Sequence, residues 1–336
     1  MIELQIDLPN NPYSVYLEDH LLDRFSVYLS SKDSCVILTD SGIPVQYLEK
    51  VKAQLNSPTV FTIPKGESSK NLSNYQAIVE EMIAEDIPKS ATLISLGGGV
   101  VGDLGGFIAS TYMRGIDFIQ IPTTLLSQID SSVGGKVAVN SRKAKNAIGA
   151  FYQPKAVFID PTVLTTLEEK QLHSGVGELI KYGLIKDPSI LDLLEEDNWT
   201  KNLTHLIRQA IVVKRDFVLQ DEHDQNIRHV LNYGHTLGHA IEQYSSYQYL
   251  HGEAISIGMA YMARNKSFYK RLVSLFDRFQ LPHELPYSLE ELLPYLLKDK
   301  KVHKKTLHFV DVEVLGQANI IPVSLDKLQN YLEEIV

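Results

Sequence analysis

Three histidines in the second half of the chain have the spacing of a metal site. His235 and His239 are four residues apart, which places them on one face of a helix, and His251 follows shortly after. Upstream, Glu178 lies one turn before Lys181 in an otherwise apolar stretch. Two histidines and one carboxylate leave a coordination position open on Zn²⁺, which is typical of catalytic sites. The spacing does not decide which of the three histidines are ligands.

A glycine-rich turn in the first half has the pattern of an anion site. Residues 92–96 form an apolar run that leads into GGGVVGD at 97–103, and a helical pattern follows. Backbone N–H groups in such a turn, together with the helix N-terminus, suit a phosphate. The pattern does not fit G-x-G-x-x-G with an acidic residue ~20 positions later, so a different nucleotide-binding fold is predicted. Glycines after a strand also form tight turns that bind nothing.

A long continuous stretch gives this turn a specific context. Residues 97–136 (GGGVVGDLGGFIASTYMRGIDFIQIPTTLLSQIDSSVGGK) and 145–155 (KNAIGAFYQPK) closely resemble 3-dehydroquinate synthases of the sugar-phosphate cyclase superfamily. The segment NYGHTLGH at 232–239, followed by His-Gly-Glu at 251–253, resembles the same family. The resemblance covers essentially the whole chain and is thinnest before residue 60 and after residue 300.

The resemblance implies two cofactors, NAD and one divalent metal ion, Zn²⁺ or Co²⁺. It assigns Glu178, His235 and His251 as metal ligands and makes His239 a proton shuttle. The NAD contacts that it implies are Asp40, Glu67, Lys70, Gly98, Gly99, Val100, Asp103, Thr123, Thr124, Lys145, Thr165 and Thr166.

The resemblance also implies a set of polar residues that bind an anionic substrate. These are Arg114, Asp130, Lys136, Asn146, Lys181, Lys214, Arg228, Asn232 and Lys300, with Lys301 as the alternative to Lys300. Arg114, Asp130 and Lys136 are also expected to act in catalysis, with His239 and Asp224. A guanidinium or ammonium group suits phosphate and carboxylate. Asp224 departs from the family pattern, which usually has a glutamate there, so this carboxylate has a shorter reach.

The implied reaction converts 3-deoxy-D-arabino-heptulosonate 7-phosphate into 3-dehydroquinate and phosphate, in the shikimate pathway. Transient oxidation by NAD⁺ acidifies a C–H bond, phosphate is eliminated, hydride returns, and an intramolecular aldol step closes the ring. One alternative is a sister cyclase, such as a 2-deoxy-scyllo-inosose or amino-dehydroquinate synthase. Others are a metal-dependent polyol dehydrogenase, which would accumulate NADH, and a non-catalytic NAD sensor.

The elements that position these residues follow from the hydrophobic pattern. Short β-branched runs at 35–39, 59–63, 92–96, 117–121 and 156–160 alternate with helical patterns, which predicts a parallel sheet, and 4–8 and 14–17 predict a hairpin. Helices are predicted at 168–185, 200–220, 233–245, 252–272, 289–297 and 325–335, with short strands at 306–310 and 318–321. We therefore expect an α/β nucleotide-binding domain with a parallel, Rossmann-like sheet at 1–161, then a mainly α-helical metal- and substrate-binding domain at 162–336.

Composition narrows the class of protein. The 336 residues exceed the ~250–300 at which one core stops growing, and 44% hydrophobic with 22% charged residues is ordinary for a globular enzyme. A net charge of -9 argues against a nucleic-acid partner, and the single cysteine, Cys35, excludes an intrachain disulfide and a cysteine-rich zinc site. No apolar run is long enough for a membrane span and the first residues lack a signal-peptide pattern. The cytoplasm is therefore the expected compartment, and the resemblance implies a homodimer that acts on a sugar phosphate.

Overall fold

A computed structural model describes residues 1–29, 31, 33–297 and 306–335. The chain forms two compact units, Met1–Leu167 and Glu168–Val336. The division falls six residues after the expected boundary at 161, since the 3-10 helix Pro161–Thr166, capped by the Asp160 side chain, belongs to the first unit. Each unit is described by itself.

The first unit is built on a seven-stranded sheet with strand order β1-β2-β9-β6-β5-β3-β4. The strands are β1 (Ile2–Ile6), β2 (Tyr13–Leu17), β3 (Cys35–Asp40), β4 (Thr59–Ile63), β5 (Thr92–Gly97), β6 (Asp117–Pro122) and β9 (Ala156–Ile159). Only the β1–β2 hairpin is antiparallel; β2 pairs in parallel with β9, and the other pairs in this sheet are parallel. The predicted parallel α/β class is therefore confirmed.

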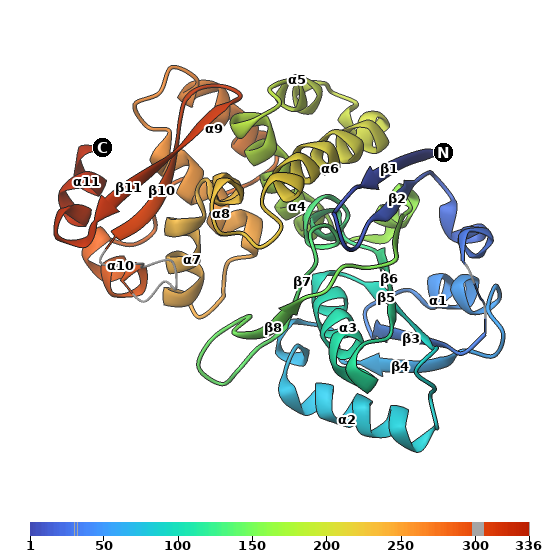
Figure 1. Cartoon of the computed structure of the whole chain (residues 1–336). Helices are drawn as coiled ribbons and strands as arrows, with labels where there is room; N and C mark the ends of the chain where they lie inside the picture. The colour runs from blue at the N-terminus through green and yellow to red at the C-terminus, as the bar shows by residue number, and fades with distance from the viewer. Residues whose placement is uncertain (30, 32, 298–305, 336) are drawn as a thin grey trace. The chain divides into compact units, whose positions relative to one another are not determined.

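Both faces of this sheet are covered, as its continuous apolar strands require. Along β3, Val36 and Leu38 point into a core shared with helices α2 (Leu72–Ala84) and α3 (Gly99–Thr111). Cys35 and Ile37 point into a second core that includes helix α1 (Val45–Lys52). The alternation of side chains along one strand thus separates two cores, and the helices on the two faces are visible in Figure 1.

A second, antiparallel hairpin of the first unit was not predicted. Strands β7 (Lys136–Val139) and β8 (Ile148–Phe151) pair with each other apart from the main sheet. Val137 packs against Gly106 of α3, where an added Cβ would lie 2.3 Å from the Val137 side chain. The hairpin therefore rests on the helix that follows the glycine-rich turn.

The second unit is mainly helical, as predicted. Its elements are α4 (Glu169–Ile185), α5 (Ser189–Glu195), α6 (Leu203–Gln220), α7 (His235–Tyr244), α8 (His251–Met262), α9 (Tyr269–Arg278), α10 (Leu289–Leu296), the β10 (Thr306–Val314) and β11 (Gln317–Ser324) hairpin, and α11 (Leu328–Glu334). The single helix predicted at 252–272 is wrong. The chain leaves the helix after Met262, and Lys266 in the connection pairs with Asp311 and Glu313 of β10. Among the described residues, no helix is long and apolar enough to cross a membrane.

Close helix contacts in this unit depend on glycine. A Cβ added to Gly252 in α8 would lie 1.8 Å from the Ser174 carbonyl oxygen of α4. One added to Gly258 would lie 2.0 Å from the carbonyl oxygen of Gly234, which precedes α7. These two positions therefore allow α8 to pack directly on the backbones of its neighbours, and that packing brings α4, α7 and α8 together.

Candidate functional site

Three helices of the second unit bring a carboxylate and three imidazoles to one place. Glu178 lies in the middle of α4, His235 is the first residue of α7 with His239 one turn later, and His251 is the first residue of α8. The Glu178 Oε1 atom lies 3.4 Å from His235 Nε2 and 3.7 Å from His251 Nε2. The three ligands that the resemblance implied therefore face one another.

His239 belongs to the same cluster. One ring nitrogen from each of His235, His239 and His251 lies within 4.8 Å of the others. Two overlapping donor sets are thus present, three histidines or two histidines with Glu178. The choice between a ligand and a shuttle role for His239 stays a prediction.

The donor set fits a divalent metal ion. Glu178 is fully buried, and within the described part of the chain its Oε1 has no hydrogen-bond partner although two imidazoles face it. A buried carboxylate oxygen without a donor is costly, and a cation between it and the imidazoles would remove that cost. Neutral imidazole nitrogens with one carboxylate are ligands that Zn²⁺ and Co²⁺ accept.

The other ring nitrogen of each implied ligand histidine also has an acceptor. His235 Nδ1 lies 3.0 Å from the Tyr233 carbonyl oxygen, and His251 Nδ1 lies 3.4 Å from Glu242 Oε1. Burial by itself lowers the pKa of His251, but the Glu242 carboxylate outweighs it and the pKa is raised. Glu242 was not predicted from the sequence. Its signal was spacing, because His235, His239 and Glu242 are at i, i+4 and i+7 on one face of α7.

Other predicted residues of the second unit lie around these helices. Lys181 pairs with the Oε2 of Glu178 in the buried interior of α4. Lys214 of α6 and Arg228 are both buried, and Arg228 Nη1 donates to the Glu222 carbonyl oxygen at 2.7 Å. Asn232 ends the 3-10 helix Ile227–Asn232, three residues before His235. Lys300 and its alternative Lys301 lie outside the described residues.

Asp224 occupies a strained position in the loop after α6. Its φ angle is 54°, in the left-handed region, and its carbonyl oxygen lies 3.0 Å from His229 Nε2. The same imidazole lies 4.0 Å from Asp224 Oδ1. Asp224 therefore shapes the loop that precedes Arg228, and its expected catalytic role stays a prediction.

The predicted nucleotide contacts of the first unit gather at one edge of its sheet. Asp40 ends β3, Gly98 follows β5 and caps α3, and Thr123 and Thr124 follow β6. Strands β3, β5 and β6 are parallel neighbours, and Gly97 of β5 lies opposite Pro122 of β6. The carboxyl ends of the three strands therefore lie at the same edge of the sheet. Ligands of open α/β sheets bind at this edge. The N-terminus of α3, with Gly99 and Val100 in its first turn, lies at the same edge.

Three further predicted contacts form an ion cluster around the buried Lys70. The Lys70 ammonium lies 2.9 Å from Asp103 Oδ2 and 3.2 Å from Glu67 Oε1. Burial by itself lowers the pKa of Lys70, but the two carboxylates outweigh it and hold the pKa above its usual value. Asn140, which was not predicted, donates from Nδ2 to Glu67 Oε1 at 2.7 Å and accepts from the Asn146 backbone N–H at 2.9 Å. It joins the segments that carry Lys70 and Asn146.

The remaining predicted residues of the first unit are more exposed. Arg114 and Lys136 are exposed, Asp130 and Lys145 are half-buried, and Thr165 and Thr166 lie on the 3-10 helix that ends the unit. The Thr166 hydroxyl lies 3.1 Å from the Tyr47 hydroxyl. Exposed cationic groups remain accessible to an anionic substrate.

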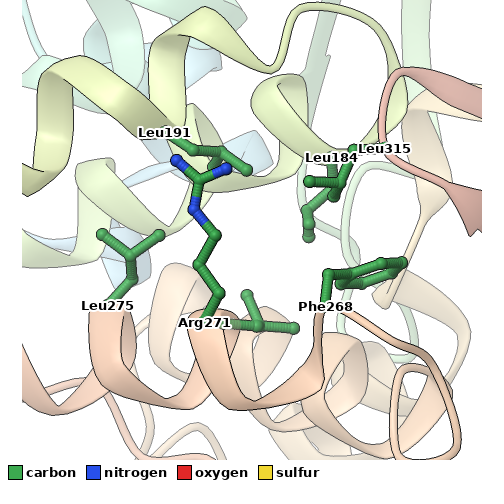
Figure 2. A pocket seen from close by; sticks show the side chains of 7 residues that line it. Leu184, Leu191, Phe268, Arg271, Leu275 and Leu315 are labelled. Atoms are coloured by element: carbon green, nitrogen blue, oxygen red, sulfur yellow. The ribbon is translucent and has the colours of Figure 1, made fainter.

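A hollow elsewhere in the second unit is not part of this site. It is lined by Leu184, Leu191, Phe268, Arg271, Leu272, Leu275 and Leu315 (Figure 2) and has no room for a water molecule. The Arg271 guanidinium is already bonded to Glu195 and Asp192. The lining is otherwise apolar and includes no predicted site residue, so the hollow is an imperfection in packing.

Comparison with known proteins extends over both units. The family model described as 3-dehydroquinate synthase N-terminal matches residues 60–174, and the model described as 3-dehydroquinate synthase C-terminal matches residues 175–302. Two 3-dehydroquinate synthases from Streptococcus pneumoniae strains are 40% and 41% identical, each alignment covering 98% of this chain and 99% of the relative.

Solved structures of related cyclases have the same fold. A 2-deoxy-scyllo-inosose synthase complexed with carbaglucose-6-phosphate, NAD⁺ and Co²⁺ is 25% identical, with a TM-score of 0.85 over 99% of this chain and 100% of that one. A 2-epi-5-epi-valiolone synthase from Streptomyces hygroscopicus, with NAD⁺ and Zn²⁺ bound, is 25% identical, with a TM-score of 0.84 over 96% of both chains. Because the family models together match more than half of the chain and the relatives align along nearly all of it, the chain belongs to the 3-dehydroquinate synthase family.

Proposed function

We propose that this protein is a 3-dehydroquinate synthase that forms 3-dehydroquinate and phosphate from 3-deoxy-D-arabino-heptulosonate 7-phosphate. One observation supports the proposal most strongly. Glu178 Oε1 is buried, faces His235 and His251, and has no hydrogen-bond partner within the described ranges of the chain. The chain that carries it is about 40% identical to 3-dehydroquinate synthases. A degenerate relative that only senses NAD has no reason to retain a buried carboxylate that a cation must satisfy.

The proposed cofactors are NAD and one divalent ion, held by Glu178, His235 and His251. When bound, NAD⁺ supplies reversible hydride transfer and the ion supplies a Lewis acid for a substrate oxygen. The strand ends at Asp40, Gly98 and Thr123 are proposed to hold the dinucleotide, with the α3 N-terminus at its pyrophosphate.

The chain's own residues are proposed to bind and orient the substrate. Arg114 and Lys136 neutralise its anionic groups, assisted by Asn146 in the first unit and by Lys214, Arg228 and Asn232 in the second. His239, whose ring nitrogen lies within 4.8 Å of the other two histidine donors, transfers a proton to or from the substrate. Asp130 and Asp224 are proposed as further catalytic carboxylates.

A sister cyclase is the second candidate, because the 2-deoxy-scyllo-inosose synthase has the same fold over the whole chain. That protein is 25% identical, whereas the 3-dehydroquinate synthases are about 40% identical. The difference favours the heptulosonate substrate.

To test the proposal, purified protein is loaded with Co²⁺ and a catalytic amount of NAD. It is then assayed in parallel with two substrates, the heptulosonate phosphate and glucose 6-phosphate. Phosphate release, 3-dehydroquinate formation and NADH absorbance are followed together. We expect stoichiometric phosphate and dehydroquinate from the heptulosonate without accumulation of NADH. Turnover of glucose 6-phosphate alone would identify a sister cyclase, and a steady rise in NADH would identify a dehydrogenase.

We also propose that the protein acts as a homodimer in the cytoplasm, with NAD bound by the first unit and the metal ion by the second. The dimer is what the family resemblance implies, and a single buried cysteine is compatible with a reducing compartment. Sedimentation of the purified protein tests the dimer, which a monomer at micromolar concentration would contradict.

A further inference from the structure

Glu242 is a buried acid that the proposed reaction leaves without a role. It lies on α7 two turns after His235, and the residue is only 9% exposed. A carboxylate at such a depth needs a polar partner, since burial of an uncompensated charge costs several kcal/mol or more. One partner is His251, whose Nδ1 lies 3.4 Å from Glu242 Oε1.

The two nitrogens of His251 face two different carboxylates. Nε2 is directed at Glu178 Oε1, at 3.7 Å, while Nδ1 is directed at Glu242. The two nitrogens of an imidazole point in different directions, so a carboxylate on Nδ1 does not share an ion with Nε2. Among the described residues, the donor atoms grouped within 4.8 Å come from His235, His239 and His251 and do not include Glu242.

We propose that Glu242 is the positioning residue of the metal site, which orients His251 and makes it a stronger ligand. This inference rests on the metal site proposed above. Hydrogen bonding from Nδ1–H to a carboxylate fixes the tautomer with a lone pair on Nε2 and increases the electron density that Nε2 offers to a cation. His235 is oriented in the same way by the Tyr233 carbonyl oxygen, at 3.0 Å, which is neutral.

Glu242 also affects the charge of the site. Glu178, Glu242 and the Lys181 ammonium together carry one net negative charge when both acids are ionised and the histidines are neutral. Without Glu242 the same group would be neutral, and a divalent cation would meet one negative charge fewer. Orientation and charge therefore both predict weaker metal binding when Glu242 is removed.

Metal affinity is the direct test and does not depend on turnover. Co²⁺ is titrated into metal-free protein in competition with a chromophoric chelator, and the visible absorption of the Co²⁺-loaded protein is recorded. We expect Glu242→Ala to raise the Kd for Co²⁺ by about 10- to 100-fold, the usual effect of removing such a partner, and to change the absorption spectrum. Glu242→Gln keeps an accepting oxygen without the charge, so it should restore part of the affinity.

A matched control separates this effect from the general loss of an acidic side chain in the same unit. Asp311→Asn removes a carboxylate from the same unit, but Asp311 pairs with Lys266 at 3.0 Å rather than with a histidine. Its Kd for Co²⁺ should stay within about twofold of the wild-type value. If Glu242→Ala does not fold, the Kd of Glu242→Gln for Co²⁺ is compared with that of Asp311→Asn instead.

A double-mutant cycle tests whether Glu242 acts through His251. In a His251→Ala background, Glu242→Ala should weaken Co²⁺ binding much less than in wild type, because the residue it orients is gone and only the effect of its charge remains. Equal weakening in both backgrounds would overturn the inference, as would wild-type affinity and spectrum in both Glu242 variants. Wild-type protein that binds no Co²⁺ would reject the metal site itself. Normal Co²⁺ binding without turnover of the heptulosonate would reject only the proposed reaction.

Discussion

Lys181 and Glu178 form a buried ion pair one helical turn apart on α4, with their side chains 2% and 0% exposed. The ammonium contacts Oε2, whereas Oε1 faces His235 and His251. The two oxygens of one carboxylate thus serve two different positive groups, the lysine and the proposed metal ion. This division explains why a full charge is tolerated in the core of the helical unit.

Replacing Lys181 by Met should destabilise the metal-free protein by about 3–5 kcal/mol, because it leaves Glu178 buried without its partner. Excess Co²⁺ should reduce this loss, since the cation compensates the same carboxylate. Urea unfolding with and without Co²⁺ measures both values. As a control, Lys181→Met combined with Glu178→Gln removes both charges and should recover most of the stability. A loss under about 1 kcal/mol in Lys181→Met would show that the pair is unimportant.

Alanine variants of the three histidines should separate ligands from the proton shuttle. His235→Ala and His251→Ala should each weaken Co²⁺ binding at least about tenfold, because each removes a proposed ligand. His239→Ala should bind Co²⁺ normally while phosphate release falls by about 100-fold or more. The chelator competition and a phosphate assay provide the two readouts. Loss of Co²⁺ binding in His239→Ala would make His239 a ligand and correct the assignment.

Gly252→Ala should separate α8 from α4. The added Cβ would lie 1.8 Å from a backbone oxygen that cannot rotate away, so we expect a loss of about 3 kcal/mol, at the upper end of overpacking effects. Because α4 and α8 carry Glu178 and His251, Co²⁺ binding should weaken as well. Urea unfolding and the Co²⁺ titration measure the two effects.

Gly102→Ala is the matched control for this change. It lies inside α3, and its Cβ would meet the movable end of Gln120 at 2.7 Å rather than backbone. Inside a helix, alanine stabilises a protein by up to about 1 kcal/mol relative to glycine. This gain offsets the cost of a small movement of the Gln120 side chain. Equal losses from Gly252→Ala and Gly102→Ala would contradict the argument from close helix packing.

Lys70→Met should destabilise the first unit by an amount that does not depend on pH near neutrality. The pKa of Lys70 is raised in the folded protein. Its charge therefore contributes fully to the free energy of unfolding at every pH below the unfolded pKa of about 10.4, and this contribution is lost only as the pH rises through the folded pKa. The difference from wild type in urea unfolding should be constant between about pH 6 and pH 9. A difference that declines steadily over this range would contradict the raised pKa.

Lys52→Met is the control for that series. Lys52 pairs with Glu49 at 2.9 Å, but the two side chains are 37% and 58% exposed, so solvent already screens the pair. We expect little change in stability at any of these pH values. A loss as large as that of Lys70→Met would show that burial is not what makes the Lys70 cluster important.

The regular parts of the fold were predictable from the sequence. The β-branched runs of the parallel sheet have a simple signal, because strands covered on both faces are apolar throughout. The β7–β8 hairpin was missed, since each strand has four residues and Gly149 weakens the pattern of the second. The break between α8 and α9 has no proline or glycine at 263–268 to indicate it. Pairing of Lys266 with Asp311 and Glu313 accompanies that break, and such long-range contacts are not visible in local sequence.

The candidate site was predictable only in part. The spacing of His235 and His239 indicated a shared helix face, but the pairing with Glu178 came from family resemblance, because more than fifty residues separate them. Glu242 was missed because an acidic residue on a helix is usually solvated, and only its spacing from the histidines indicated otherwise. Asn140 gave no signal of its own, since asparagine in a loop is ordinary.

The pairing of β2 with β9 sets a delay in the assembly of the first unit. Residues 14–17 align with residues 156–159, so during synthesis the β1–β2 hairpin has no partner strand in the sheet until almost the entire first unit has been made. Contacts so far apart in sequence form slowly, and an unpaired strand edge is prone to aggregate. We therefore expect fragments that end before residue 156 to aggregate, and fragments that end after residue 167 to remain in solution. Within the first unit, the β1–β2 hairpin is therefore made early but joins its sheet late.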